Sequence, residues 1–241
     1  MVPVSSALER IAKGLSADDR RRVKEIVEDL DLRVRVLGRQ FEFVSHSVKE
    51  RKTEFGSVNI SNILGQELQR MFQGYLRWRK DETNADYTLV QINGERIDTG
   101  IFVYGNADDL LVAFYDIFEN AVADYAISKE VLKERGGEII ISAELINGFA
   151  HVVISDNGLG MAVDEIRKYN DLFLKACSDT DIIYVAPMDK RPEKGPTKTL
   201  IGLQHAPSVF ADIRCDGVRG RMEVRIGTPF GTEFHIWLPT C

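Results

Sequence analysis

The sequence has few cysteines, no long hydrophobic run and no excess of positive charge. Its three cysteines, Cys177, Cys215 and Cys241, are widely spaced without a metal-binding pattern, so we expect reduced thiols. No run of about 18 apolar residues is present, and the first residues lack the pattern of a signal peptide, so we expect no membrane span. A net charge of −6 argues against nucleic-acid binding through bulk charge. These absences predict a cytoplasmic protein whose partners are neither membranes nor nucleic acids.

The composition is that of a folded domain. The 241 residues are 44% apolar and 28% charged, which are ordinary fractions for a globular protein. This length suits one large domain with a small appendage. The pattern of apolar residues divides the chain accordingly, into a helical segment at residues 1–56 and a larger domain at residues 57–241.

The first segment carries a heptad seam. Ser16 is expected to cap the helix and Gly56 to end it. The seam spacings alternate between four and three residues, and the intervening residues are mostly charged or polar. The seam residues are Val23, Val27, Leu30, Val34, Leu37, Phe41, Val44 and Val48. So narrow a seam needs a partner, which is either the chain's own domain or a second copy in a coiled-coil-like homodimer.

The second part alternates between helix and strand patterns. Helices are expected at 60–79 and 108–126, and strands at 87–92, 96–104, 138–145, 150–155, 222–226 and 233–238. Asn147-Gly148 is a strong turn dipeptide and predicts a hairpin between two of these strands. The economical architecture is a two-layer α/β sandwich, in which a mixed sheet carries helices on one face.

Residues 156–161, with the sequence Asp-Asn-Gly-Leu-Gly-Met, follow a strand-like apolar run. An aspartate at the end of a strand can accept hydrogen bonds, and two nearby glycines let the backbone approach a flat or anionic ligand. The same residues also suit a simple tight turn. A second segment, residues 116–121 with the sequence Asp-Ile-Phe-Glu-Asn-Ala, lies upstream in a helical stretch and favours a binding site.

An acid and an amide on a helix, followed by a strand and an Asp-x-Gly-x-Gly turn, resemble the nucleotide site of the GHKL superfamily, whose ATP-binding domain has the Bergerat fold. The similarity is greatest to the catalytic ATP-binding domain of sensor histidine kinases, because residues 231–239 resemble the closing strand of that domain. The resemblance implies ATP and Mg²⁺ as cofactors.

The same resemblance implies roles for individual residues. Asn120 would hold the magnesium ion that bridges the nucleotide phosphates, which suits an ion that takes few protein oxygens. Asp156 would accept a hydrogen bond from the adenine amino group and so favour ATP over GTP. The other residues expected at the nucleotide are Asp124, Gly158, Gly160, Met161, Lys194, Gly195, Gly202, Leu203 and Thr232.

Residues 186–198 are rich in proline and cations and are expected to form a flexible lid over the phosphates. A solvated loop with no role is the alternative. Residues 195–203 resemble the second glycine box of the family, whose backbone amides meet phosphates at the start of a helix. Residues 196–199 depart from the dense glycine pattern of that box.

The chemistry after binding rests on three candidates. Asp116 lies one helical turn before Asn120, where ATP-hydrolysing relatives carry the carboxylate that polarises water, and Glu119 is a weaker candidate. His46 resembles a phosphoacceptor histidine, but Ser47 stands where an acid normally follows, and a solvated surface histidine is favoured. His151, His205 and His235 are interpreted as packing or edge residues.

Two functions follow from these observations. The first is the ATP-binding catalytic domain of a sensor histidine kinase, which transfers the γ-phosphoryl group of ATP to a histidine and works with a response regulator or phosphotransfer protein. The second is a GHKL ATPase or a non-catalytic, nucleotide-binding regulatory module.

Overall fold

The computed structural model describes residues 16, 18–19, 21–23, 34, 55–83, 90–122, 127–178, 201–227 and 231–241. The chain divides into two compact units, Met1–Val48 and Lys49–Cys241. In the first unit, residues 18–19, 21–23 and 34 are helical, and Ser16 Oγ accepts a hydrogen bond from the Asp19 amide at 3.2 Å. The N-cap is therefore where the sequence predicts it. The rest of the heptad seam, apart from Val23 and Val34, lies outside the described residues.

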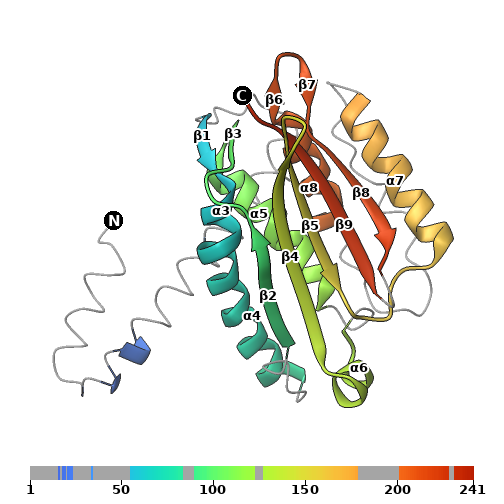
Figure 1. Ribbon diagram of the computed structural model, residues 1–241. Coiled ribbons are helices and arrows are strands. Elements are labelled where there is room, and N and C mark those ends of the chain that lie inside the picture. Colours follow the sequence, from blue (N-terminus) through green and yellow to red (C-terminus); the bar gives the residue numbers. More distant parts are fainter. Residues whose placement is uncertain are drawn as a thin grey trace. The chain divides into compact units, whose positions relative to one another are not determined.

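In the second unit, the described strands form a five-stranded sheet in the order β2-β4-β5-β9-β8 (Figure 1). β2 pairs with β4 in parallel and the other neighbours are antiparallel, so the sheet is mixed. Its strands are β2 (Val90–Ile97), β4 (Gly137–Ile146), β5 (Phe149–Asp156), β8 (Arg221–Ile226) and β9 (Thr232–Pro239). Two small sheets pair β1 (Gly56–Asn59) with β3 (Phe102–Gly105), and β6 (Arg214–Cys215) with β7 (Val218–Arg219).

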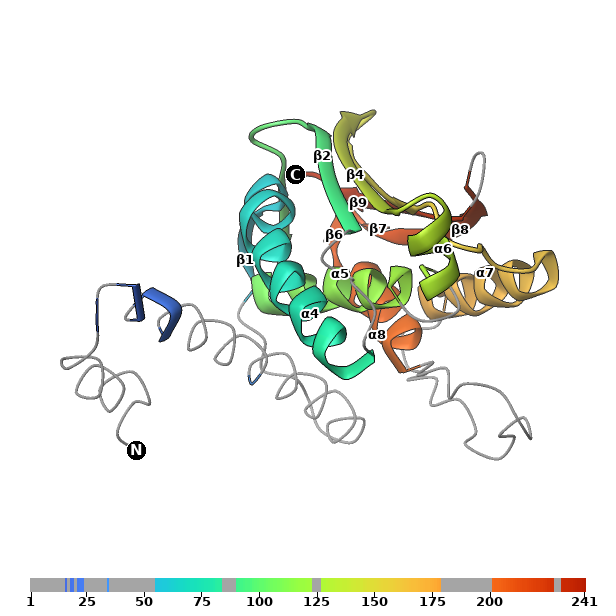
Figure 2. The same ribbon diagram turned by 90° about the horizontal axis from the view of Figure 1, so that it is seen from below.

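Helices lie along one side of the sheet, as Figure 2 shows. They are α3 (Ile60–Asn62), the π-helical turn η1 (Ile63–Glu67), α4 (Leu68–Thr83), α5 (Ala107–Ala121), α6 (Lys129–Glu134), α7 (Val163–Ser178) and α8 (Ile201–Asp212). α5 packs against both α4 and α8, and α7 packs against β8. The two-layer sandwich with helices on one face of a mixed sheet is confirmed.

Alternation along β5 divides the two faces of the sheet. Ala150, Val152 and Ile154 are buried beneath the helices, whereas His151 and Val153 face the opposite side. The hairpin to β4 turns at Asn147 and Gly148, which have φ values of 49° and 80°. Because such a two-residue turn with positive φ fits the twist of paired strands, the Asn-Gly signal specifies the register here.

The sequence does not predict several elements correctly. The start expected at residue 87 lies outside the described residues, but β2 extends to Ile97 and β3 is only Phe102–Gly105, so the strand expected at 96–104 is divided between them. α6 and α7 are not predicted, and α7 occupies the beginning of the stretch between the Asp-x-Gly-x-Gly turn and the expected lid. The lid residues 186–198 lie outside the described residues.

The expectation of reduced thiols is wrong for two cysteines. Cys215, on β6, and Cys241 form a disulfide. Their sequence separation of 26 residues hides this pairing, because β6 meets the end of the chain only in the folded domain. Among the described helices, none combines the length and apolar character that crossing a bilayer requires.

Candidate nucleotide-binding site

Asp156 is the last residue of β5 and lies on the helix-covered face of the strand. Its side chain is 6% exposed. The Gly158 amide donates a hydrogen bond to Asp156 Oδ1 at 2.8 Å, and the Thr232 amide also donates to this carboxyl group. Both donors are backbone groups, so the carboxyl group is fixed in direction without a neutralising cation from the described residues. A buried acceptor held in this way can receive a further donor from a ligand.

Two glycines let the backbone close around Asp156. Gly231 has a φ of 93°, and a Cβ added there would collide with the Asp156 carbonyl group and lie 2.9 Å from its Oδ1. Gly160 has a φ of 76°, and a Cβ there would lie 2.8 Å from the Gly231 carbonyl oxygen. Because side chains are excluded at both positions, the start of β9 approaches the loop after β5 closely. The sequence elements around Asp156 and Thr232 therefore form one site.

Burial raises the pKa of Asp156 to about 7, and the Gly158 and Thr232 amides oppose this shift. Desolvation disfavours the charged carboxylate, whereas hydrogen-bond donors favour it. A strongly perturbed acid at the end of a strand is typical of a functional site. A hydrogen-bond donor from a ligand would act together with the two amides and stabilise the ionised form of Asp156.

The loop after Asp156 is anchored on the beginning of β4. The Asn157 amide donates to the Glu138 carbonyl oxygen at 3.1 Å, and Asn157 Oδ1 accepts from the Glu138 amide at 2.9 Å. Asn157 Nδ2 donates to the Gly136 carbonyl oxygen at 3.2 Å. Arg135, at the end of α6, donates to the carbonyl oxygens of Asn157 and Gly158.

Asn120 and Asp116 lie on α5, one turn apart. Both side chains are buried, with exposures of 8% and 1%. Asn120 Nδ2 donates to the Asp116 carbonyl oxygen at 2.6 Å. Because the side-chain nitrogen of Asn120 points at the helix backbone, its side-chain oxygen is the atom that could bind a cation. The residues therefore fit the magnesium role expected of Asn120.

The topology brings most of the other expected residues to the same end of the sandwich. β5 ends, β4 and β9 begin, and α5 ends on this side, so Asn120 and Asp156 lie at one end (Figure 1). Gly202 and Leu203 belong to the first turn of α8, which packs beside α5. Met161 is half-buried just after the glycine loop, and Glu119 is half-buried on α5. Asp124, Lys194, Gly195 and His46 lie outside the described residues.

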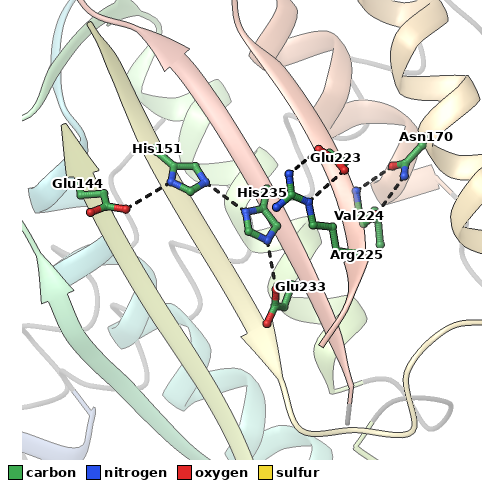
Figure 3. A network of polar contacts seen from close by, with 8 residues as sticks. All are labelled: Glu144, His151, Asn170, Glu223, Val224, Arg225, Glu233 and His235. Atoms are coloured by element: carbon green, nitrogen blue, oxygen red, sulfur yellow. Dashed lines mark hydrogen bonds and ion pairs between the residues drawn. The ribbon is translucent and has the colours of Figure 1, made fainter. Parts of the chain in front are cut away.

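The opposite face of the sheet carries a separate polar network, shown in Figure 3. His151 Nε2 and His235 Nδ1 lie 3.1 Å apart, and the outer nitrogens of the two rings approach Glu144 at 3.5 Å and Glu233 at 3.1 Å. Burial lowers the pKa of His151, while its contact with Glu144 raises it. Both rings stack near Trp237, so the interpretation of these histidines as packing residues is confirmed.

This network has no geometry for a metal ion. Nowhere in the described ranges do three or more His, Cys, Asp or Glu side chains converge on a common point. The His151 and His235 ring centroids are 5.4 Å apart with nearly coplanar rings, so the facing nitrogens point directly at each other. Such a pair shares a proton in a hydrogen bond rather than directing two lone pairs at a third atom.

A separate cavity of about 360 Å³ lies at the beginning of α5. Its lining includes Asn106, Asp109, Asp212 and Arg214. Asn106 Oδ1 accepts from the Asp109 amide at 2.9 Å as the helix cap. The polar side chain of Asn106 therefore has a structural role here, and Asn120 lies at the far end of the same helix.

The sequence motifs include Gly231 and Asn157 but assign neither a role, and they do not include Arg135. Gly231 carries a detectable signal, because glycine before a strand next to an expected ligand residue indicates close backbone approach. Asn157 lies inside the recognised loop, but its partners on β4 depend on the register of the hairpin. Arg135 gives no signal, because an exposed arginine at the end of a charged six-residue helix is ordinary.

No protein-family model and no curated protein sequence matches this chain. Among solved structures, a nucleotide-free catalytic domain of the histidine kinase ThkA is similar with a TM-score of 0.52 and 15% identity, over 78% of this chain and 97% of that one. A second nucleotide-free form of the ThkA domain has a TM-score of 0.51 and 13% identity, over 78% of this chain and 98% of that one. The mycobacterial sensor histidine kinase MprB has a TM-score of 0.48 and 20% identity, over 77% of this chain and 97% of that one. The similarity to the ThkA domain shows that the matched part of the chain has the fold of a histidine kinase catalytic domain.

Proposed function

We propose that this chain is the ATP-binding catalytic part of a cytoplasmic sensor histidine kinase or a histidine-kinase-like protein. In this proposal the adenine amino group donates to the Asp156 carboxylate, and the Gly158–Gly160 loop leaves room for the base. The observation that carries the proposal is the buried Asp156 carboxyl group, held by two backbone amides at the end of β5. The fold shared with ThkA supports it.

The phosphate end of the proposed site depends on α5 and α8. Asn120 would hold a magnesium ion, which offsets phosphate charge when bound. Gly202 and Leu203, in the first turn of α8, would present backbone amides to the phosphates, since helix N-termini attract anions. Lys194, Gly195 and Asp124 complete the proposed set. The γ-phosphoryl group would then pass in line to a histidine nitrogen.

The helical segment is proposed to form a homodimer through its heptad seam. Val34, a seam residue, is 63% exposed in the single chain, which supports a partner on this side. A response regulator or phosphotransfer protein would receive the phosphoryl group. His46 remains a weak candidate for the phosphoacceptor, since the residue after it is Ser47.

An ATPase is the second candidate, because Asp116 lies one turn before Asn120. The Asp116 side chain lies on the same helix face as Asn120, one turn away, where a carboxylate that polarises the attacking water would be expected. Asp116→Asn would abolish phosphate release in this case and leave ATP affinity nearly unchanged.

The proposal is tested with γ-labelled ATP and Mg²⁺, by following acid-labile protein phosphate and free phosphate together in the wild type, His46→Ala and Asp116→Asn. Protein label establishes a histidine kinase, and its loss in His46→Ala would identify the acceptor. Free phosphate that disappears in Asp116→Asn establishes an ATPase. Bound ATP without either product indicates a regulatory module, and absence of ATP binding refutes the nucleotide site itself.

A further inference from the structure

Arg135 joins the end of α6 to the loop after Asp156. Its Nη2 donates to the Asn157 carbonyl oxygen at 2.8 Å and to the Gly158 carbonyl oxygen at 2.8 Å. A single guanidinium nitrogen thus holds two successive carbonyl groups, which requires both to point toward the same side of the loop. Hydrogen bonds from a charged donor are stronger than those between neutral groups.

The first of these carbonyl groups connects Arg135 with Asp156. The Asn157 carbonyl group and the Gly158 amide belong to one peptide unit, which is planar with its C=O and N–H pointing in opposite directions. Arg135 binds the oxygen end of this unit, and Asp156 Oδ1 binds the amide end at 2.8 Å. Fixing the oxygen therefore fixes the direction of the N–H group that orients the Asp156 carboxyl group.

The position of Arg135 is itself well defined. α6 is capped by the Ser128 side chain, which accepts from the Val131 amide at 3.3 Å, and the Arg135 amide donates to the Val131 carbonyl oxygen. Gly136 and Glu138, the neighbours of Gly137 at the start of β4, bind the Asn157 side chain. The loop is thus held both through the Asn157 side chain and through the Arg135 guanidinium group.

We propose that Arg135 is a positioning residue for adenine recognition, which holds the Asn157–Gly158 peptide so that Asp156 presents its carboxylate to the base. This inference rests on the proposed nucleotide site. Arg135 acts through the peptide unit and needs no contact with the nucleotide. It is therefore a determinant of the preference for adenine over guanine.

The first test uses the ligand-free protein, so that it does not depend on nucleotide binding. In Arg135→Ala the Asn157–Gly158 peptide loses the donor on its oxygen, and Asp156 loses part of the amide donation that favours its ionised form. We expect the Asp156 carboxyl resonance to titrate at a higher pH than in the wild type. Arg167→Ala is the matched control, because Arg167 makes only an exposed contact with Asp164 at 3.8 Å among the described residues. An unchanged titration midpoint in Arg135→Ala overturns the inference.

The second test measures ATP and GTP affinity by calorimetry. Arg135→Ala is expected to bind ATP roughly tenfold more weakly, about the effect of one charge-assisted hydrogen bond, with a smaller loss for GTP. Arg135→Lys keeps a charged donor and should recover part of the ATP affinity, while Arg167→Ala stays at the wild-type value. Wild type that binds no ATP refutes the proposed function. Wild type that binds ATP, with an equal affinity in folded Arg135→Ala, refutes only the role of Arg135.

Discussion

The two faces of β5 provide different partners for their titratable side chains. Asp156, on the helix side, is held by backbone amides from its own loop and from the start of β9. His151, on the other side, contacts the side chains of His235, Glu144 and Trp237 on neighbouring strands. Burial raises the pKa of the acid and lowers that of the base, so each is pushed towards its neutral form.

The difference in partners separates a binding site from a structural network. The histidines contact side chains of the protein itself, in cross-strand rows that include Glu144–His151 and His151–Trp237. Among the described residues, the Asp156 carboxylate receives only neutral backbone amides, so it keeps acceptor capacity for a donor from a ligand. The comparison therefore supports the proposal that ligand binding belongs to one face of the strand and a structural role to the other.

The largest effect is expected from crowding the Asp156 side at Gly231. Gly231→Ala places a methyl group against the Asp156 carbonyl at a φ of 93°, and we expect it to lower the free energy of unfolding by about 3 kcal/mol, with loss of ATP affinity. Gly217→Ala is the control, because its φ of 79° is equally unfavourable but no atom lies within 4 Å of the added Cβ. It should cost about 1 kcal/mol in urea unfolding. Equal losses at both positions would contradict close packing at the site.

A smaller effect is expected from pH. In the free protein, the raised pKa means that the stability contributed by neutral Asp156 is fully present below its ordinary value of 3.8 and is lost as the pH rises towards 7. Adenine recognition needs the ionised carboxylate, so ATP affinity has the opposite trend. We expect about tenfold weaker binding at pH 6 than at pH 8. Asp156→Asn should show only the dependence that comes from the phosphates of ATP, and an identical profile in both proteins would exclude Asp156 titration.

The smallest effect is expected from a substitution of His151, on the face of the sheet that the helices do not cover. His151→Phe keeps the stacking on Trp237 but removes both nitrogen contacts, and should cost less than about 1 kcal/mol at pH 8. Because the pKa of His151 is lowered, its stabilising effect is present above 6.5 and is lost as the pH falls below that value. The variant should therefore lose less stability than wild type between pH 7.5 and 5.5, measured by urea unfolding. A change in its ATP affinity would contradict the division between the faces.

The predictable part of the fold is its local patterning. Alternation over β5 and the Asn147-Gly148 turn specify the hairpin, and the helical spacing around Phe114 and Phe118 specifies α5. α7 is missed although Ile166, Tyr169 and Phe173 lie at helical spacings on its buried face, because the expectation of a lid after the glycine turn competes with that periodicity. α6 is missed because a six-residue charged helix has too few apolar positions to show a period.

The motif residues of the candidate site can be predicted from the sequence, but the residues that support them cannot. Asp156, Gly158, Gly160 and Thr232 are recognised from their motifs, and the pairing of β5 with β9 brings them together in the structure. The supports contributed by Arg135 and Asn157 join residues 22 and 19 positions apart, and such contacts leave no local signal in a single sequence. The His151–His235 contact is unpredictable for the same reason, since it crosses between strands 84 residues apart.

The central claim is that the Asp156 end of the sandwich binds adenine nucleotides. It is tested most directly by calorimetric titration of ATP and GTP into wild type, Asp156→Ala and His151→Phe at pH 8 with Mg²⁺, with circular dichroism to establish that each variant is folded. We expect wild type and His151→Phe to bind ATP equally and in preference to GTP, and Asp156→Ala to bind ATP about a hundredfold more weakly or not at all. Unchanged ATP affinity in folded Asp156→Ala would contradict the account.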